Sequence, residues 1–169
     1  MKKIILAFAF MPVFSNVIAQ ESNDTIKKHE LKLNVFYTLG ALPEVTYEYL
    51  LNDESAIGMS VLFSVDDDIE LNWGLTPYYR FYFGKKHAAG FFLEGFGMLN
   101  SSEEFIYSYG GPNTYEDQID FALGLALGGK FITKKGFVGE LYLGAGGNLF
   151  NENAIDGVPR FGISLGKRF

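Results

Sequence analysis

Apolar and polar residues alternate along eight short segments of this 169-residue chain, and this alternation limits the folds open to it. In the clearest segment Phe121, Leu123 and Leu125 occupy one parity, and Ala122 and Gly124 occupy the other. Successive side chains of a β-strand point to opposite faces, so the pattern predicts strands with two chemically different faces. We expect the strands within residues 31–39, 45–51, 57–65, 71–83, 89–100, 121–131, 140–146 and 160–169.

The two parities differ in side-chain size, which indicates the face that each one forms. The polar parity is rich in glycine, for example Gly58, Gly128 and Gly144, and glycine in a strand needs a steric reason such as a crowded interior. The other parity carries bulky Phe, Leu, Tyr and Trp, which hydrocarbon would accommodate better than the inside of a small barrel. The sequence therefore predicts an all-β fold, an eight-stranded antiparallel up-and-down transmembrane β-barrel. A soluble periplasmic β-barrel that binds a hydrophobic ligand, with the apolar parity inside, is the alternative.

Charged residues also occur in the middle of the strands, on the glycine-rich parity. Three are acidic and three are basic: Glu48, Arg80, Glu94, Lys130, Glu140 and Arg160. An isolated charge in a low-dielectric lumen is very costly, so we expect these groups to pair as an interior charge network. A path for protons or ions is the functional alternative, although lumens of eight strands are normally filled by side chains.

The N-terminus has the three regions of an export signal. Lys2 and Lys3 give a positive start, an apolar run follows over residues 4–14, and Ala19 ends a short stretch suited to signal peptidase. We therefore expect a signal peptide at residues 1–19, a short periplasmic tail at 20–29, and an outer-membrane β-barrel domain at 30–169.

The joins between the expected strands alternate in length. In chain order the seven joins span residues 40–43, 52–55, 66–70, 84–87, 100–118, 133–136 and 148–157. The even-numbered joins are short. The first join is a tight turn, and the other odd-numbered joins are longer and acidic. Short periplasmic turns and longer outer loops are typical of bacterial outer-membrane barrels, so we place the odd joins outside the cell. Aromatic residues near the strand ends would form girdles at both interfaces, with Tyr37, Phe63, Trp73 and Phe121 outside and Phe81, Phe83, Phe131 and Phe169 inside.

Residue types that support catalysis or cofactor binding are scarce. The chain has no Cys, and its two histidines, His29 and His87, fall before the first strand and in an inner turn, away from the outer face. We expect no enzymatic activity, because the extracellular end of the barrel has no histidine to act as a general base. We also expect no cofactor and no metal site. The acidic stretch 66–70 could hold a hard cation, but a solvated loop is the favoured interpretation. A net charge of −6 argues against nucleic-acid binding.

The join at residues 100–118 is the best candidate for contact with a partner. It carries four aromatic residues among acids, Phe105, Tyr107, Tyr109 and Tyr115. Exposed aromatics on a presented loop can anchor a partner. A β-hairpin that continues beyond the membrane is the favoured interpretation of Phe105, Tyr107 and Tyr109, because alternation alone explains their spacing.

Three stretches, residues 43–51, 77–84 and 158–169, resemble the small eight-stranded outer-membrane barrels of the OmpA/OmpX type, especially single-domain members from Bacteroidetes. Two positions depart from the family pattern: Lys167 breaks the apolar ending, and Pro77 lies inside a strand, where we expect a bulge or kink. The ending, with Phe161, Ile163, Leu165 and Phe169, resembles the signal that the barrel-insertion machinery reads.

The resemblance implies a monomer in the outer membrane of a Gram-negative bacterium. Its partners would be outer-membrane lipid, lipopolysaccharide, the insertion machinery and a surface partner of unknown identity. We expect a non-enzymatic role in envelope structure or in surface interaction through the outer loops.

Overall fold

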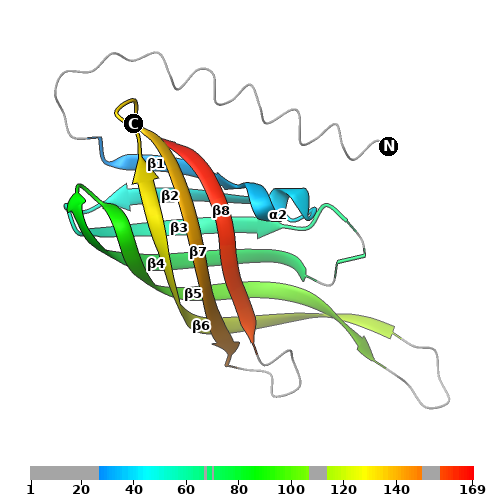
Figure 1. Cartoon of the computed structure of the whole chain (residues 1–169). Coiled ribbons are helices and arrows are strands. Elements are labelled where there is room, and N and C mark those ends of the chain that lie inside the picture. The colour runs from blue at the N-terminus through cyan, green and yellow to red at the C-terminus, as the bar shows by residue number, and fades with distance from the viewer. Residues whose placement is uncertain (1–26, 67, 70, 107–113, 150–156) are drawn as a thin grey trace.

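The computed structural model describes residues 27–66, 68–69, 71–106, 114–149 and 157–169, and in them eight strands form one closed barrel (Figure 1). The strand order is β1-β2-β3-β4-β5-β6-β7-β8, and every pair of neighbours is antiparallel. The elements are β1 His29–Asn34, α2 Val35–Leu39, β2 Glu44–Leu50, β3 Ser55–Phe63, β4 Leu71–Lys86, β5 Ala89–Ile106, β6 Thr114–Ile132, β7 Phe137–Asn148 and β8 Val158–Arg168. The predicted up-and-down topology is confirmed.

The barrel closes between its first and last strands. Leu33 of β1 lies opposite Leu165 of β8, and the His29 and Phe169 backbones exchange two N–H···O bonds of 3.2 and 2.8 Å. Closure gives both outermost strands a hydrogen-bonding neighbour, which removes the open edge that a flat sheet would expose. It also places the start of β1 and the end of β8 at the barrel end that carries the joins after β2, β4 and β6. We call this the short-join end.

The expected first strand is too long, because residues 35–39 form the short helix α2. The Asn34 side chain accepts a hydrogen bond from the Tyr37 amide at 3.3 Å, and the Thr38 hydroxyl donates to the Asn34 carbonyl at 2.6 Å. Gly40 ends the helix by donating to the Tyr37 carbonyl at 3.0 Å. A capping residue and a glycine stop therefore override the alternation here. The first join is consequently longer than the predicted turn at 40–43.

Pro77 does not mark a bulge. It lies opposite Met59 in the β3–β4 ladder, and the register between β4 and β5 is the same before and after it. The register shifts of this pair lie instead near the ends of β4, between Leu71 and Trp73 and between Phe83 and Lys86. The expectation of a bulge at Pro77 was wrong, because the missing N–H leaves the strand alignment intact.

Most of the long join predicted at 100–118 is strand. The β5–β6 ladder continues to Ile106 opposite Thr114, with Phe105 opposite Tyr115, so the hairpin interpretation holds for these two positions. Pairing of β5 with β4 ends at Ser102, and the hairpin projects beyond the barrel wall (Figure 1). Tyr107 and Tyr109 lie outside the described residues.

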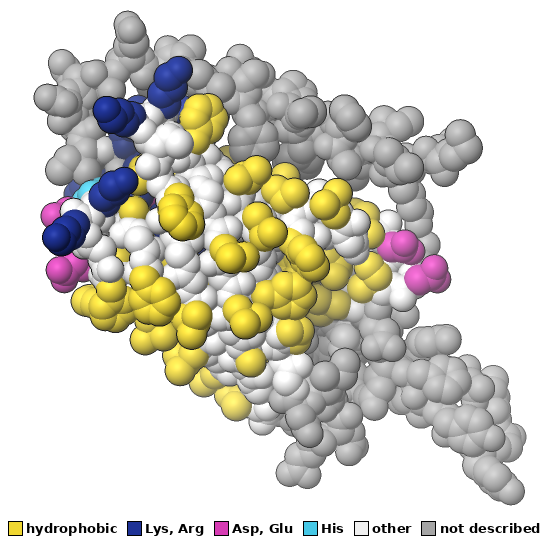
Figure 2. All heavy atoms as spheres, viewed as in Figure 1, with side chains coloured by type: hydrophobic (Ala, Val, Ile, Leu, Met, Phe, Trp, Pro, Cys, Tyr) yellow, Lys and Arg dark blue, Asp and Glu magenta, His cyan; other side chains and the backbone are white. Residues whose placement is uncertain are grey.

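The two faces of the barrel have the chemistry that the parities predicted. Large apolar side chains cover the outside, where Leu125, Leu143 and Phe131 are 63%, 66% and 75% exposed (Figure 2). The inside is crowded at the glycine positions: a Cβ on Gly128 would lie 2.4 Å from the Leu141 carbonyl oxygen. The described residues contain no helix that is both long enough and apolar enough to cross a membrane.

Candidate functional site: the charged barrel interior

Ten of the buried charged side chains in the described part of the barrel pair with one another as an interior network, and none of the ten is more than 6% exposed. Five are acidic and five are basic: Glu30, Glu44, Glu48, Glu94, Glu140, Lys32, Arg80, Lys130, Arg160 and Arg168. The structure brings together all six residues of the predicted network. It adds Glu30, Lys32, Glu44 and Arg168, which sequence reasoning missed although they continue the inward parity toward the strand ends. The formal charges of the ten side chains balance.

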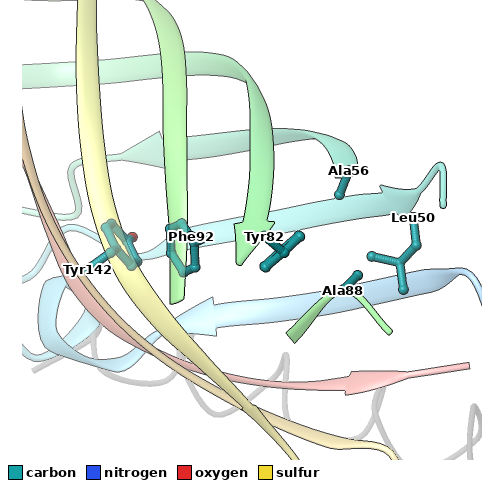
Figure 3. Packing of buried hydrophobic residues seen from close by; sticks show 6 residues of the cluster. All are labelled: Leu50, Ala56, Tyr82, Ala88, Phe92 and Tyr142. Atoms are coloured by element: carbon teal, nitrogen blue, oxygen red, sulfur yellow. The ribbon is translucent and has the colours of Figure 1, made fainter. Parts of the chain in front are cut away.

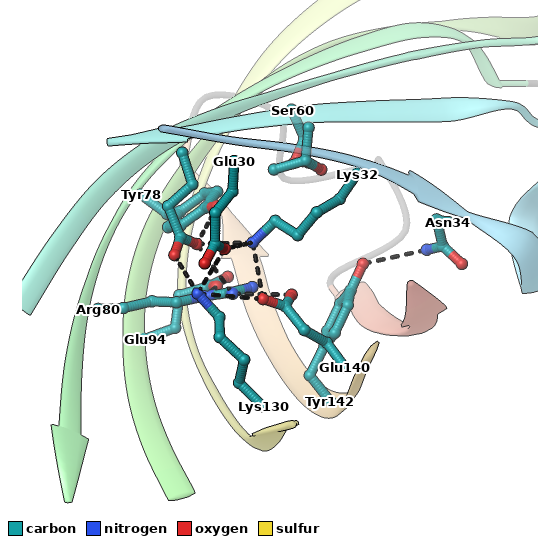
Figure 4. Close-up of polar contacts among 12 residues, drawn as sticks. Glu30, Lys32, Asn34, Ser60, Tyr78, Arg80, Glu94, Lys130, Glu140 and Tyr142 are labelled. Carbon is teal, nitrogen blue, oxygen red and sulfur yellow. Dashed lines mark hydrogen bonds and ion pairs between the residues drawn. The ribbon is translucent and has the colours of Figure 1, made fainter. Parts of the chain in front are cut away.

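Glu48 is the centre of this network, and Figure 4 labels the three cations that it contacts, Lys32, Arg80 and Lys130. Its Oε2 lies 2.7 Å from Lys32 Nζ and 3.0 Å from Arg80 Nη1, and its Oε1 contacts Lys130 Nζ. Glu140 faces the same three cations, at 2.7 Å from Lys32, 2.8 Å from Arg80 and 3.3 Å from Lys130. The two carboxylates and three cations come from five different strands, so the cluster ties the barrel wall together across the lumen.

Tyrosines complete the coordination of Glu48. The Tyr78 hydroxyl donates to Oε2 at 2.7 Å and the Tyr82 hydroxyl donates to Oε1 at 2.8 Å. The Arg80 guanidinium also lies over the Phe92 ring, 4.1 Å from its centroid, which stabilises a desolvated cation. Buried charges are tolerated when their remaining hydrogen-bonding positions are filled in this way.

The network continues away from the short-join end. Glu94 accepts hydrogen bonds from the Nε atoms of both Arg80 and Arg160. Arg160 then reaches Glu44 at 3.2 Å. The other Glu44 oxygen accepts a hydrogen bond from Asn34 at 2.8 Å.

At the short-join end, Arg168 closes the network. Its Nε lies 2.7 Å from Glu30, and its two terminal nitrogens donate to the carbonyls of His87 and Ala88 at 2.9 and 3.0 Å. Glu30 in turn pairs with Lys130 at 2.8 Å. The last residue of β8 is thereby attached to the join between β4 and β5.

Two hydrophobic clusters pack inside the barrel beside the charges. The first includes residues next to the short joins and consists of Leu50, Ala56, Tyr82, Ala88, Phe92 and Tyr142 (Figure 3). The second lies toward the opposite end and consists of Tyr78, Phe96, Met98, Ala122 and Ala126. Aromatic rings belong to both clusters and also contact the charges, so packing and ion pairing are shared by the same side chains.

The three carboxylates of Glu30, Glu48 and Glu140 come close enough to bind a cation, with oxygens within 4.8 Å of one another. Lys32 and Lys130 each contact all three carboxylates, at distances of up to 3.6 Å. Their ammonium groups therefore supply the positive charge that a metal ion would otherwise bring.

The histidines lie outside this network. His29 Nδ1 is 2.6 Å from the Tyr47 hydroxyl, and the His87 ring contacts Asp53. Both residues are at the short-join end, as the sequence indicated. The interior network itself holds the strands together, because its carboxylates and cations already contact one another.

The acidic join after β3 forms a local turn where it is described. The Asp68 amide donates to the Asp66 carboxylate at 3.2 Å, and the Ser64 hydroxyl donates to the Asp66 carbonyl at 2.7 Å. Asp67 and Glu70 lie outside the described residues, so the cation-binding alternative for the whole stretch stays a prediction.

Most of the residues proposed for the girdles and for the insertion signal lie on the outside of the barrel. Exposed among them are Phe63, Trp73, Phe81, Phe83, Phe131, Ile163, Leu165 and Phe169. Phe121 and Phe161 are half-buried. Tyr37, expected in a strand, lies instead in α2, where its ring packs edge-on against Phe161 with centroids 5.1 Å apart.

These features define a class: small, closed, up-and-down eight-stranded β-barrels with an apolar outer surface and an ion-paired interior. Among solved structures, the chain is similar to the N-terminal β-barrel domain of OprF from Pseudomonas aeruginosa, with a TM-score of 0.56. The match covers 84% of this chain and 96% of that domain at 16% sequence identity, and it concerns the fold. No protein-family model matches the sequence. No curated protein matches it.

Proposed function

We propose that this chain is a non-enzymatic outer-membrane β-barrel with a filled polar lumen and a role in envelope structure or surface interaction. The observation that carries the proposal is the distribution of side chains: the bulky apolar residues face outward and the paired charges face inward. A water-soluble barrel would expose that continuous apolar surface to solvent, whereas a bilayer covers it. The similarity to the OprF domain supports the fold on which the proposal rests.

The alternative, a soluble carrier of a hydrophobic ligand, requires an apolar cavity inside the barrel. The described interior instead holds ten paired charges and two packed hydrophobic clusters. The side chains suited to an apolar ligand, such as Leu123, Leu125 and Leu127, are each more than half exposed on the outside. We therefore favour the membrane barrel.

In this proposal the interior network is structural. Each of its cations contacts at least one carboxylate contributed by another strand, so the network fixes the cross-section of the barrel. Moving an ion through the lumen would require these pairs to separate in a low-dielectric space, which is costly. We propose a closed lumen, with little conductance in planar bilayers.

The surface role is assigned to the end opposite the short-join end. The β5–β6 hairpin projects there, and it carries Phe105 and Tyr115 on paired positions, with Tyr107 and Tyr109 between them in the sequence. We propose that these aromatics contact a surface partner. Export by the signal peptide at residues 1–19, insertion directed by the C-terminal ending, contact with lipopolysaccharide and a monomeric state belong to the same proposal.

Membrane fractionation tests the proposal directly. When the full chain is expressed in a Gram-negative host, we expect it in the outer-membrane fraction. We also expect its extraction to require detergent. The folded barrel is expected to migrate faster than the boiled form on a gel. A periplasmic protein of known location serves as the control for osmotic shock. Release of the chain by osmotic shock as a detergent-free monomer would contradict the proposal.

A further inference from the structure

We infer that seven lysines around the short-join end bind the phosphate headgroups of anionic phospholipids in the surrounding leaflet. This lysine rim consists of Lys27, Lys28, Lys85, Lys86, Lys134, Lys135 and Lys167. The inference rests on the proposed membrane location. It adds a lipid class to that proposal, and it assigns the lipid contact to one end of the barrel.

The cations outside the interior network are unevenly distributed along the chain. From residue 27 onward the sequence has twelve Lys and Arg, the fourteen of the whole chain less Lys2 and Lys3. Five of the twelve belong to the interior network, and the other seven form the lysine rim. Every described cation that faces away from the lumen is thus at one end of the barrel.

The opposite end has the reverse charge. The segments that join strands there, residues 35–43, 64–70, 107–113 and 149–157, contain no Lys or Arg but several acids. Figure 2 shows the dark-blue side chains gathered at one end, with some magenta ones beside them, and magenta side chains without dark-blue ones at the other end. The short joins contribute only Asp53 and Glu54 as exposed acids, and Asp53 contacts His87. The rim therefore keeps a clear positive excess.

Several lysines of the rim lie next to the apolar outer surface of the barrel. Lys85 follows Phe83 by two residues near the end of β4, and both residues are exposed, Phe83 by 56%. Lys134 and Lys135 lie between Phe131 and Phe137, both more than half exposed. The amines thus follow immediately on aromatic residues that border the hydrocarbon, at the depth of lipid headgroups.

Lys167 shows how such a side chain is held. Its Nζ lies 4.3 Å from the centroid of the Phe137 ring and donates to the Lys135 carbonyl at 2.7 Å. This cation on the outward parity of β8 is therefore packed along the apolar surface with its charge at the border of the band. Lysines in this arrangement bury their aliphatic stem and present the ammonium to the interface. The residue that departs from the apolar ending of the sequence thus has a position in the rim.

Phosphate could also reach this end from solution. A hollow of about 380 Å³ opens at the mouth of the lumen, lined in part by Lys27, Thr133 and Lys134. Only Lys27 and Lys134 of the seven line this hollow, whereas Lys167 packs on the exposed Phe137 ring and Lys85 follows the exposed Phe83. For this reason we assign the rim to lipid and use inorganic phosphate as a competing probe.

The test uses the full mature chain in nanodiscs of phosphatidylcholine mixed with phosphatidylglycerol. Lipids that stay bound after mild detergent extraction are counted by native mass spectrometry. The wild type is expected to retain phosphatidylglycerol several-fold above its share in the nanodisc, and added salt should reduce this enrichment because exposed charges are screened. A variant with Lys85, Lys134, Lys135 and Lys167 all changed to Gln should lose the enrichment. The matched control changes the same four residues to Arg and should keep it.

Three outcomes would overturn the inference: equal retention of both lipids by the wild type, unchanged enrichment in the Gln variant, or displacement of the lipid by inorganic phosphate at constant ionic strength. These outcomes differ from a failure of the proposed function. A chain that does not enter nanodiscs and stays soluble without detergent contradicts the membrane location itself. A chain that inserts without lipid preference contradicts only the role of the lysine rim.

Discussion

Glu48 and Arg80 meet across the lumen with 3.0 Å between carboxylate oxygen and guanidinium nitrogen, although β2 and β4 are not neighbours in the sheet. The intervening strand β3 contributes small residues at the same level, with Ala56 opposite Arg80 and Gly58 opposite Glu48. The small side chains of β3 leave space in the lumen, so the long charged side chains of β2 and β4 can reach one another across it. The interior network depends on this pairing of small residues on one strand with large charged residues on the adjacent strands.

Replacing Arg80 with Leu is expected to lower the stability of the barrel by about 3–5 kcal/mol, because it leaves buried carboxylates without their partner. Glu48, Glu94 and Glu140 all contact Arg80 in the folded protein. Thermal unfolding in detergent, followed by circular dichroism, measures the change. Lys85→Leu on the exposed end of β4 is the control and should unfold near the wild-type temperature. An unchanged transition for Arg80→Leu would show that the network does not contribute to stability.

Arg168 and Glu30 should be energetically coupled. The two residues pair at 2.7 Å while Arg168 also holds the carbonyls of the β4–β5 join. A double-mutant cycle with Arg168→Met and Glu30→Gln is expected to give a coupling free energy of about 0.5–3 kcal/mol, the range for residues in direct contact. Denaturant unfolding of the four proteins supplies the values. Additive effects of the two substitutions would contradict the pairing.

Gly128 and Gly129 are neighbours that face opposite sides of the wall, so they form a matched pair. A Cβ on Gly128 would lie 2.4 Å from the Leu141 carbonyl oxygen and 2.7 Å from the Phe92 ring, whereas one on Gly129 would meet only the Phe131 ring at 3.8 Å. We expect Gly128→Ala to cost about 1–3 kcal/mol through overpacking. Gly129→Ala should change stability by less than about 0.5 kcal/mol, as surface substitutions usually do. Equal effects would mean that the lumen is less crowded than described.

A lysine placed on the outer face reports directly on the solvent that surrounds the barrel. Leu125 is 63% exposed in the middle of β6, so Leu125→Lys should destabilise the barrel in a bilayer by about 2–4 kcal/mol. Phe131→Lys, near the short-join end, should cost about 0–1 kcal/mol because the charge can reach the interface. Unfolding of both variants in lipid vesicles measures the difference. A neutral effect at Leu125 would indicate water rather than lipid outside.

Particular residues show why the sequence predicted part of this structure and missed the rest. The period of two is a local property, so the eight strands and the inward parity of Arg80 and Lys130 could be read from adjacent residues. The helix α2 could not, because alternation runs on through Leu39 while the Asn34 cap and the Gly40 stop decide the conformation. Glu30 and Lys32 were missed because they lie near the expected tail.

By itself the sequence determined the number of strands, the chemistry of each face and the candidate charges, because these depend only on spacing along one strand. Tertiary structure decided which charges meet. The stagger of eight strands around a closed barrel sets the level at which each side chain enters the lumen, and that stagger depends on hydrogen-bond registers between distant segments. Lys32 and Glu140 are 108 positions apart and lie 2.7 Å from each other for this reason.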